Sequence, residues 1–265
     1  MDSAATRRAD MLGMRVVSAI VLLPVALAAV WFGPPWIVLI VAVAGLAMAW
    51  EWGRLVAAGQ FGADTAIIMA VVVLAIGGAA IGRFASALAV ALIGAIAAAT
   101  LRRRDWIWTG VGTLWIACGC VAFVWLDAAD GRLVMLWLLG VVWATDIFAY
   151  FVGKTVGGPR LAPQLSPNKT WAGFAGGLFG GAAAGIVAAV WTGWPSGRIA
   201  AISLGLSLVS QGGDLAESWA KRHFAVKDTS GLIPGHGGVL DRLDGLLAAT
   251  VALGLLTFVS MLHIR

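Results

Sequence analysis

The polar residues most able to do chemistry lie between residues 214 and 244. Four of them recur at the i, i+3, i+4 and i+7 spacing of one helical face: Asp214, Glu217, Ser218 and Lys221. Asp241 and Asp244 open the next apolar stretch, so four carboxylates converge on the ends of two consecutive helices. No cysteine lies in this region, and an oxygen-rich set of this kind favours a hard cation such as Mg²⁺ over zinc.

Cations and glycines accompany these carboxylates. Lys221, Arg222 and Lys227 precede a loop in which glycines surround His236. Cations interleaved with metal-binding carboxylates are typical of phosphoryl or nucleotidyl transfer, because catalysis there depends on positioning and on neutralising phosphate charge. The alternative is an ion-pair network that only closes the helix ends, but such a network does not account for the glycines.

Two further features point to the same chemistry. Asp146 lies well inside an apolar run, where a carboxylate is costly unless it is paired and therefore marks a site by default. The alternative is a lone Asp near a helix end. The loop after it, residues 153–170, offers Ser166, Lys169 and Thr170 just before a helix amino terminus, which favours anions. This loop lacks the spacing of a Walker phosphate loop, and a basic loop is also expected beside a membrane.

The elements that position these residues are membrane helices. The chain is 61% hydrophobic and 12% charged, against roughly 45–50% and about 25% in soluble domains. A soluble globule is therefore excluded, and we predict an all-α, polytopic integral membrane protein with about nine transmembrane helices. The predicted spans are residues 16–33, 36–53, 65–82, 84–101, 106–126, 133–152, 171–191, 199–220 and 245–262.

The distribution of positive charge sets the orientation. With nine spans, 14 of the 18 Lys and Arg residues fall on the side of the amino terminus. The positive-inside rule then places the amino terminus and all the polar motifs in the cytoplasm. The same placement explains the net charge of +5 without nucleic acid as a partner.

The polar residues are concentrated in the second half of the chain. Spans up to about residue 126 contain almost no ionisable group, whereas polar residues enter or border nearly every later span. We therefore expect two parts. Residues 1–126 would form about five membrane helices, and residues 127–265 would form about four catalytic helices with their cytoplasmic loops.

The run from Ser218 to Asp244 resembles the signature of the phosphatidate cytidylyltransferases, also called CDP-diacylglycerol synthases. The resemblance extends to Gly213-Asp214-Leu215, to Asp146 with Tyr150 and Gly153, and to residues 166–170. It includes, more weakly, Trp50-Glu51-Trp52 with Arg54-Leu55. Ala220 and Ala172 depart from the family pattern, which in many members has Glu at the second position.

The resemblance implies Mg²⁺-dependent transfer of CMP from CTP to phosphatidate in phospholipid biosynthesis, giving CDP-diacylglycerol and pyrophosphate. It assigns catalytic roles to Asp214, Asp241, Lys221, Arg222, His236 and Asp146, with His236 in positioning or phosphate contact. Metal ligands would be Asp214, Asp241, Glu217 and Asp244. Substrate contacts would be Ser166, Asn168, Lys169, Thr170, Lys227, Asp228, Gly237, Gly238 and Arg242.

The expected location is a bacterial inner membrane, with the active site on the cytoplasmic face. CTP and phosphatidate are the expected partners together with membrane lipid, and a homodimer is left open. Two other classes remain as alternatives. A cation transporter would use intramembrane carboxylates as an ion path, and a lipid-linked kinase or related phosphotransferase would use ATP or an alcohol acceptor.

Overall fold

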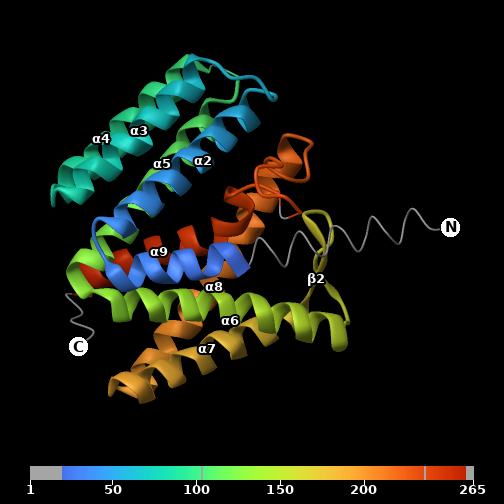
Figure 1. The fold of residues 1–265 in the computed structure, drawn as a ribbon. Coiled ribbons are helices and arrows are strands. Elements are labelled where there is room, and N and C mark those ends of the chain that lie inside the picture. The colour runs from blue at the N-terminus through green and yellow to red at the C-terminus, as the bar shows by residue number, and fades with distance from the viewer. Residues whose placement is uncertain (1–19, 103, 236, 261–265) are drawn as a thin grey trace.

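The computed structural model describes residues 20–102, 104–235 and 237–260, and these are predominantly helical (Figure 1). A first helix, Ile20–Phe32, precedes α2. The longer helices are α2 (Trp36–Val56), α3 (Ala63–Ala80), α4 (Phe84–Leu101), α5 (Trp106–Asp130), α6 (Arg132–Thr155), α7 (Trp171–Thr192), α8 (Ser196–His223) and α9 (Leu240–Ser260). Among the described residues, eight helices are long and apolar enough to cross a membrane. The prediction of an all-α polytopic membrane protein is confirmed.

The first helix is the shortest of the apolar helices in the described ranges. Its predicted span begins at residue 16, and residues 16–19 lie outside the described part of the chain. The described portion, Ile20–Phe32, is followed by Gly33 in a left-handed conformation (φ +67°) and by the start of α2. Together with the eight longer helices it makes up the nine predicted elements.

The helices form two groups with α9 between them. Helices α2, α3, α4 and α5 pack against one another, and α6, α7 and α8 form the second group (Figure 1). Helix α9 packs on both α5 and α8. The predicted boundary near residue 126 falls inside α5, whose residues Ile116 and Leu126 belong to two different apolar clusters. The division into two parts stays a prediction.

Helix α7 packs closely on α6 and α8 through its glycines. A Cβ on Gly180 would lie 2.8 Å from the backbone oxygen of Ala144 in α6, and one on Gly181 would lie 2.6 Å from Ser207 Cβ in α8. Glycine at these positions lets the backbones approach, as is usual where membrane helices pack closely. Since a tight turn at residues 193–195 joins α7 to α8, the segments before α7 and after α8 lie at the same end of the molecule (Figure 1).

One element of this end was not predicted. Residues 153–170, expected as a loop, contain a two-stranded antiparallel hairpin of β1 (Arg160–Ala162) and β2 (Ser166–Thr170). The strands are short, Pro163 directly follows β1 and Pro167 lies within β2, so they lack the alternating apolar pattern by which strands are recognised. The hairpin places the predicted substrate-contact residues 166–170 on a strand that leads directly into α7.

Helix α9 also begins earlier than predicted, at Leu240 rather than residue 245. Asp241 and Asp244 therefore lie in its first turns, on helical backbone. Hydropathy alone assigns such polar turns to the preceding loop, whereas the structure supplies acceptors for the amides at the start of this helix.

Candidate active site

Three carboxylates meet where α8 and α9 cross. One ligand oxygen from each of Asp214, Glu217 and Asp244 lies within 4.8 Å of the others. Two glycines bring the helices this close. A Cβ on Gly213 would lie 3.0 Å from the backbone oxygen of Asp244, and one on Gly245 would lie 2.6 Å from Ser210 Oγ. The helix packing therefore creates the acidic cluster.

This cluster has the character of a cation site. Glu217 is completely buried, and one of its oxygens lies in an ion pair with Lys221. Asp244 is buried as well, while the side chain of Asp214 is 39% exposed. Three carboxylates held this close together fit Mg²⁺, which prefers oxygen ligands and keeps part of its water shell.

Asp241 lies outside this group of three, and its role as a metal ligand beside Asp214 stays a prediction. Lys221 Nζ lies 2.5 Å from Glu217 Oε2 and 2.7 Å from Asp241 Oδ1. The other oxygen of Asp241 accepts hydrogen bonds from the amides of Thr229 (3.0 Å) and Gly238 (2.8 Å). Asp241 therefore neutralises Lys221 and fixes the loop, and its acceptor capacity is largely used.

The hairpin reaches the cluster through Lys169. Its Nζ lies 2.5 Å from Asp214 Oδ2. Asp146 of α6 has an exposed side chain, and its charge interacts with those of Asp214, Lys169 and Arg242. The structure therefore brings together predicted residues from α6, β2, α8 and α9.

Other predicted residues of the hairpin have structural contacts. Thr170 is buried, and its hydroxyl accepts a hydrogen bond from the amide of Gly173 at 3.0 Å, so it caps α7. Asn168 is exposed, and Ser166 is half-buried in β2. Arg222 donates from Nε to the carbonyl of Leu165 at 3.2 Å, which joins the end of α8 to the hairpin.

The segment 226–239, here called the signature loop, connects α8 to α9. Lys227 and Asp228 are exposed in it. Gly237 has φ +87°, which favours glycine, and a Cβ on Gly238 would lie 2.7 Å from Glu51 Oε1. Gly237 is therefore explained by its backbone conformation, and Gly238 by the close approach of the Glu51 side chain. His236, predicted as a catalytic residue, lies outside the described residues.

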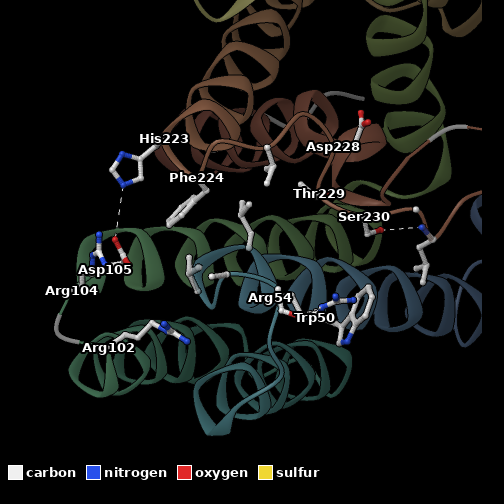
Figure 2. Close-up of a pocket in the computed structure, with 17 residues that line it drawn as sticks. Trp50, Arg54, Arg102, Arg104, Asp105, His223, Phe224, Asp228, Thr229 and Ser230 are labelled. Atoms are coloured by element: carbon white, nitrogen blue, oxygen red, sulfur yellow. Dashed lines mark hydrogen bonds and ion pairs between the residues drawn. The ribbon is translucent and has the colours of Figure 1, made fainter.

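A cavity of about 960 Å³, lined by both polar and apolar residues, lies against the signature loop (Figure 2). Arg54, Arg102 and Arg104 line one part of it, and His223, Asp228 and Ser230 line another. Arg54 lies over the ring of Trp50, 4.7 Å from its centroid, and Arg102 pairs with Asp64. This cavity was not predicted from the sequence, because its arginines come from distant segments and each fits the positive-inside bias.

Glu51 of α2 was also not predicted as a site residue. It is fully buried and contacts the signature loop, although it belongs to the half of the chain that was expected to lack chemistry. A single acidic residue in an otherwise apolar span is the signal that could have indicated it. Its position beside the loop could not be read from the sequence.

The known proteins that this chain resembles are cytidylyltransferases. A model of the cytidylyltransferase family matches residues 13–260. The chain is 39% identical over 250 residues to the phosphatidate cytidylyltransferase of Brucella abortus biovar 1 (strain 9-941), which covers 90% of each chain. It is 36% identical over 259 residues to the Pseudomonas aeruginosa protein of the same name, covering 90% of this chain and 94% of that one. A Bacillus subtilis relative of that name is 47% identical over 109 residues, 40% of each chain.

Proposed function

The chain belongs to the cytidylyltransferase family and is a nucleotidyltransferase, and on this premise we propose that it transfers CMP from CTP to phosphatidate. The products would be CDP-diacylglycerol and pyrophosphate. The observation that carries the proposal is the cluster of Asp214, Glu217 and Asp244, with Lys169 and Lys221 in contact with it, in a protein built of membrane helices. The names of the relatives support phosphatidate as the acceptor.

Mg²⁺ is the proposed cofactor, held by Asp214, Glu217 and Asp244. When bound, it would neutralise charge on the phosphate oxygens of the nucleotide and of the leaving pyrophosphate. Lys221 limits repulsion inside the cluster, since it pairs with Glu217 on one side and Asp241 on the other. Asp241 thereby supports the site as a neighbour of the metal ligands.

The reaction needs no nucleophile from the protein. A phosphate monoester is ionised at neutral pH, so an oxygen of phosphatidate can attack the α-phosphorus of CTP directly. A new oxygen–phosphorus bond forms, the bond from the α-phosphorus to the bridging oxygen breaks, and pyrophosphate leaves with that electron pair. The ammonium of Lys169 can contact a phosphate oxygen, because the side chains of Lys169 and of its partner Asp214 are both partly exposed.

We assign the nucleotide to the arginine-lined cavity. Its volume of about 960 Å³ lies within the usual range of small-molecule sites, and guanidinium groups suit phosphate oxygens. Thr229 lines this cavity and also donates a hydrogen bond to Asp241, whose partner Lys221 pairs with Glu217 of the acidic cluster. Arg104→Ala should raise the KM for CTP several-fold and leave the KM for phosphatidate unchanged. Arg83→Ala, an exposed arginine outside the cavity, is the control.

The location follows from the same premise. We propose a bacterial inner membrane with the active site on the cytoplasmic face, where CTP is available. Support comes from the bacterial relatives and from the 14 of 18 basic residues on the side predicted to be cytoplasmic.

A direct assay tests the activity. Purified protein in detergent is given CTP labelled on its α-phosphate, with and without phosphatidate and Mg²⁺. We expect label in the lipid phase only when all three are present. In parallel, ATP labelled on its γ-phosphate is offered with diacylglycerol. Lipid labelled from ATP, or no transfer from CTP, would contradict the proposal and favour a lipid-linked kinase.

A further inference from the structure

We propose that Glu51 is a positioning residue for the nucleotidyl transfer. It holds Thr229 and Ser230 near one end of the signature loop and Val239 at the other end. This proposal rests on the proposed function, because the reaction that Glu51 would support is the transfer of CMP to phosphatidate. It assigns a role to the amino-terminal helix group, which supplies no residue of the acidic cluster.

Within the described residues, the side-chain hydrogen bonds of Glu51 come from the signature loop and the residue after it. Oε1 accepts from Ser230 Oγ at 2.6 Å and from the amide of Val239 at 2.8 Å. Oε2 accepts from the amide of Leu240 at 2.7 Å and lies 3.4 Å from Thr229 Oγ1. One carboxylate thus joins the beginning and the end of a segment that contains Gly235, Gly237 and Gly238.

The chemistry explains why an ionised side chain suits this position. Glu51 is 0% exposed, and in the described ranges no ion pair is formed to it. A buried charge is costly unless hydrogen bonds compensate it. Val239 and Leu240 supply amides at the start of α9, where the helix favours an anion. Both oxygens of Glu51 accept hydrogen bonds. The NH₂ group of a neutral amide side chain would therefore face at least one N–H or O–H donor and could not accept from it.

The hydrogen bonds that Glu51 accepts from the signature loop and Leu240 are here called the clamp. A chain of contacts links the clamp to the acidic cluster. Thr229 Oγ1 lies between two carboxylates, 3.1 Å from Asp241 Oδ2 and 3.4 Å from Glu51 Oε2. Asp241 pairs with Lys221, and Lys221 pairs with Glu217 of the cluster. Loss of the clamp would therefore displace Asp241 and Lys221 as well as the loop backbone.

The test compares Glu51→Gln, which keeps the length of the side chain, with Asp127→Asn. Asp127 is a buried carboxylate near the far end of α5, outside the site. We expect Glu51→Gln to lower kcat at least tenfold per folded molecule, with the KM for phosphatidate changed less than threefold. Hydrogen exchange at the amides of Val239 and Leu240 should accelerate at least tenfold. Asp127→Asn should leave both readouts unchanged.

Ser230→Ala provides a second, milder variant should Glu51→Gln fail to fold. It removes one donor and keeps the carboxylate, so we expect a smaller loss of kcat and faster exchange in the loop. The proposal would be overturned if Glu51→Gln had both the kcat and the hydrogen exchange of the wild-type protein. If Glu51→Gln is not obtained, the same result in Ser230→Ala would overturn it. The exchange measurement requires no substrate, so a failure of the proposed reaction in the wild-type protein is distinguishable from a failure of the clamp.

Discussion

Asp214 and Asp241 differ in their surroundings, and substitution should separate their roles. Asp214 is partly exposed and pairs with Lys169, whereas Asp241 is 3% exposed and holds Lys221 and the loop. Both Asp214→Asn and Asp241→Asn should abolish turnover. Only Asp241→Asn should also lower stability, by about 3–5 kcal/mol, the cost of leaving a buried partner uncompensated. For Asp214→Asn the cost should be about 0–1 kcal/mol, as for exposed pairs.

Thermal unfolding in detergent and steady-state assays at varied Mg²⁺ measure the two effects. Near wild-type turnover at limiting Mg²⁺ in Asp214→Asn would argue against its role as a metal ligand. An unchanged melting temperature in Asp241→Asn would show that its ion pair and loop contacts contribute little.

Lys169 offers a second prediction at this scale. Because its ammonium lies 2.5 Å from Asp214, we expect Lys169→Ala to lose most activity while inserting normally. Lys169→Arg should recover only part of it, since a planar guanidinium is a different phosphate partner. Lys154→Ala is the matched control, because Lys154 carries the same charge in the same region but contacts Tyr150. Kinetics with CTP and phosphatidate varied separately would refute the role if every parameter were unchanged.

At the level of elements, the start of α7 depends on Thr170. Its buried hydroxyl accepts from the Gly173 amide, so Thr170→Val should cost about 1 kcal/mol and lower the melting temperature. Thr170→Ser keeps the acceptor and should restore stability. If Thr170 instead contacts substrate, Thr170→Val would raise a KM with no loss of stability. Thermal unfolding and kinetics of both variants distinguish the two roles.

The elements also show where sequence reasoning reaches its limit. Apolar length predicts the long helices well, because a membrane span needs a minimum number of residues. The hairpin of β1 and β2 has no such pattern, and the polar first turn of α9 depends on acceptors from other segments. The helices therefore follow from the local sequence, whereas the conformation of the loops depends on contacts with distant segments.

For the whole molecule, the charge distribution gives a testable topology. Nine spans with a cytoplasmic amino terminus place the carboxyl terminus outside. A phosphatase reporter fused after Arg265 should therefore be active, and a cytoplasmic reporter at the same position should be inactive. The opposite pattern would mean that one span has been miscounted. A fusion within the hairpin region, after Gly158, should give the reverse result.

The candidate site was predictable in its residue types more than in its pairings. The spacing of Asp214 and Glu217, and the position of Asp244 after the loop, suffice to predict that these carboxylates approach one another. That Lys221 pairs with both Glu217 and Asp241 depends on side-chain packing. The arginine-lined cavity and Glu51 required the arrangement of α2 against the signature loop, for which the sequence contains no spacing rule.

The clamp by Glu51 has a consequence for biosynthesis. Its contacts with Val239 and Leu240 span 188 and 189 residues. At a synthesis rate of about 5–20 residues per second, Glu51 leaves the ribosome roughly 10–40 seconds before those amides. During that interval the nascent chain carries a carboxylate in α2 without its final hydrogen bonds. The proposed active site, which includes Asp244, is therefore assembled only after α9 has been made, and a chain truncated before α9 would lack it.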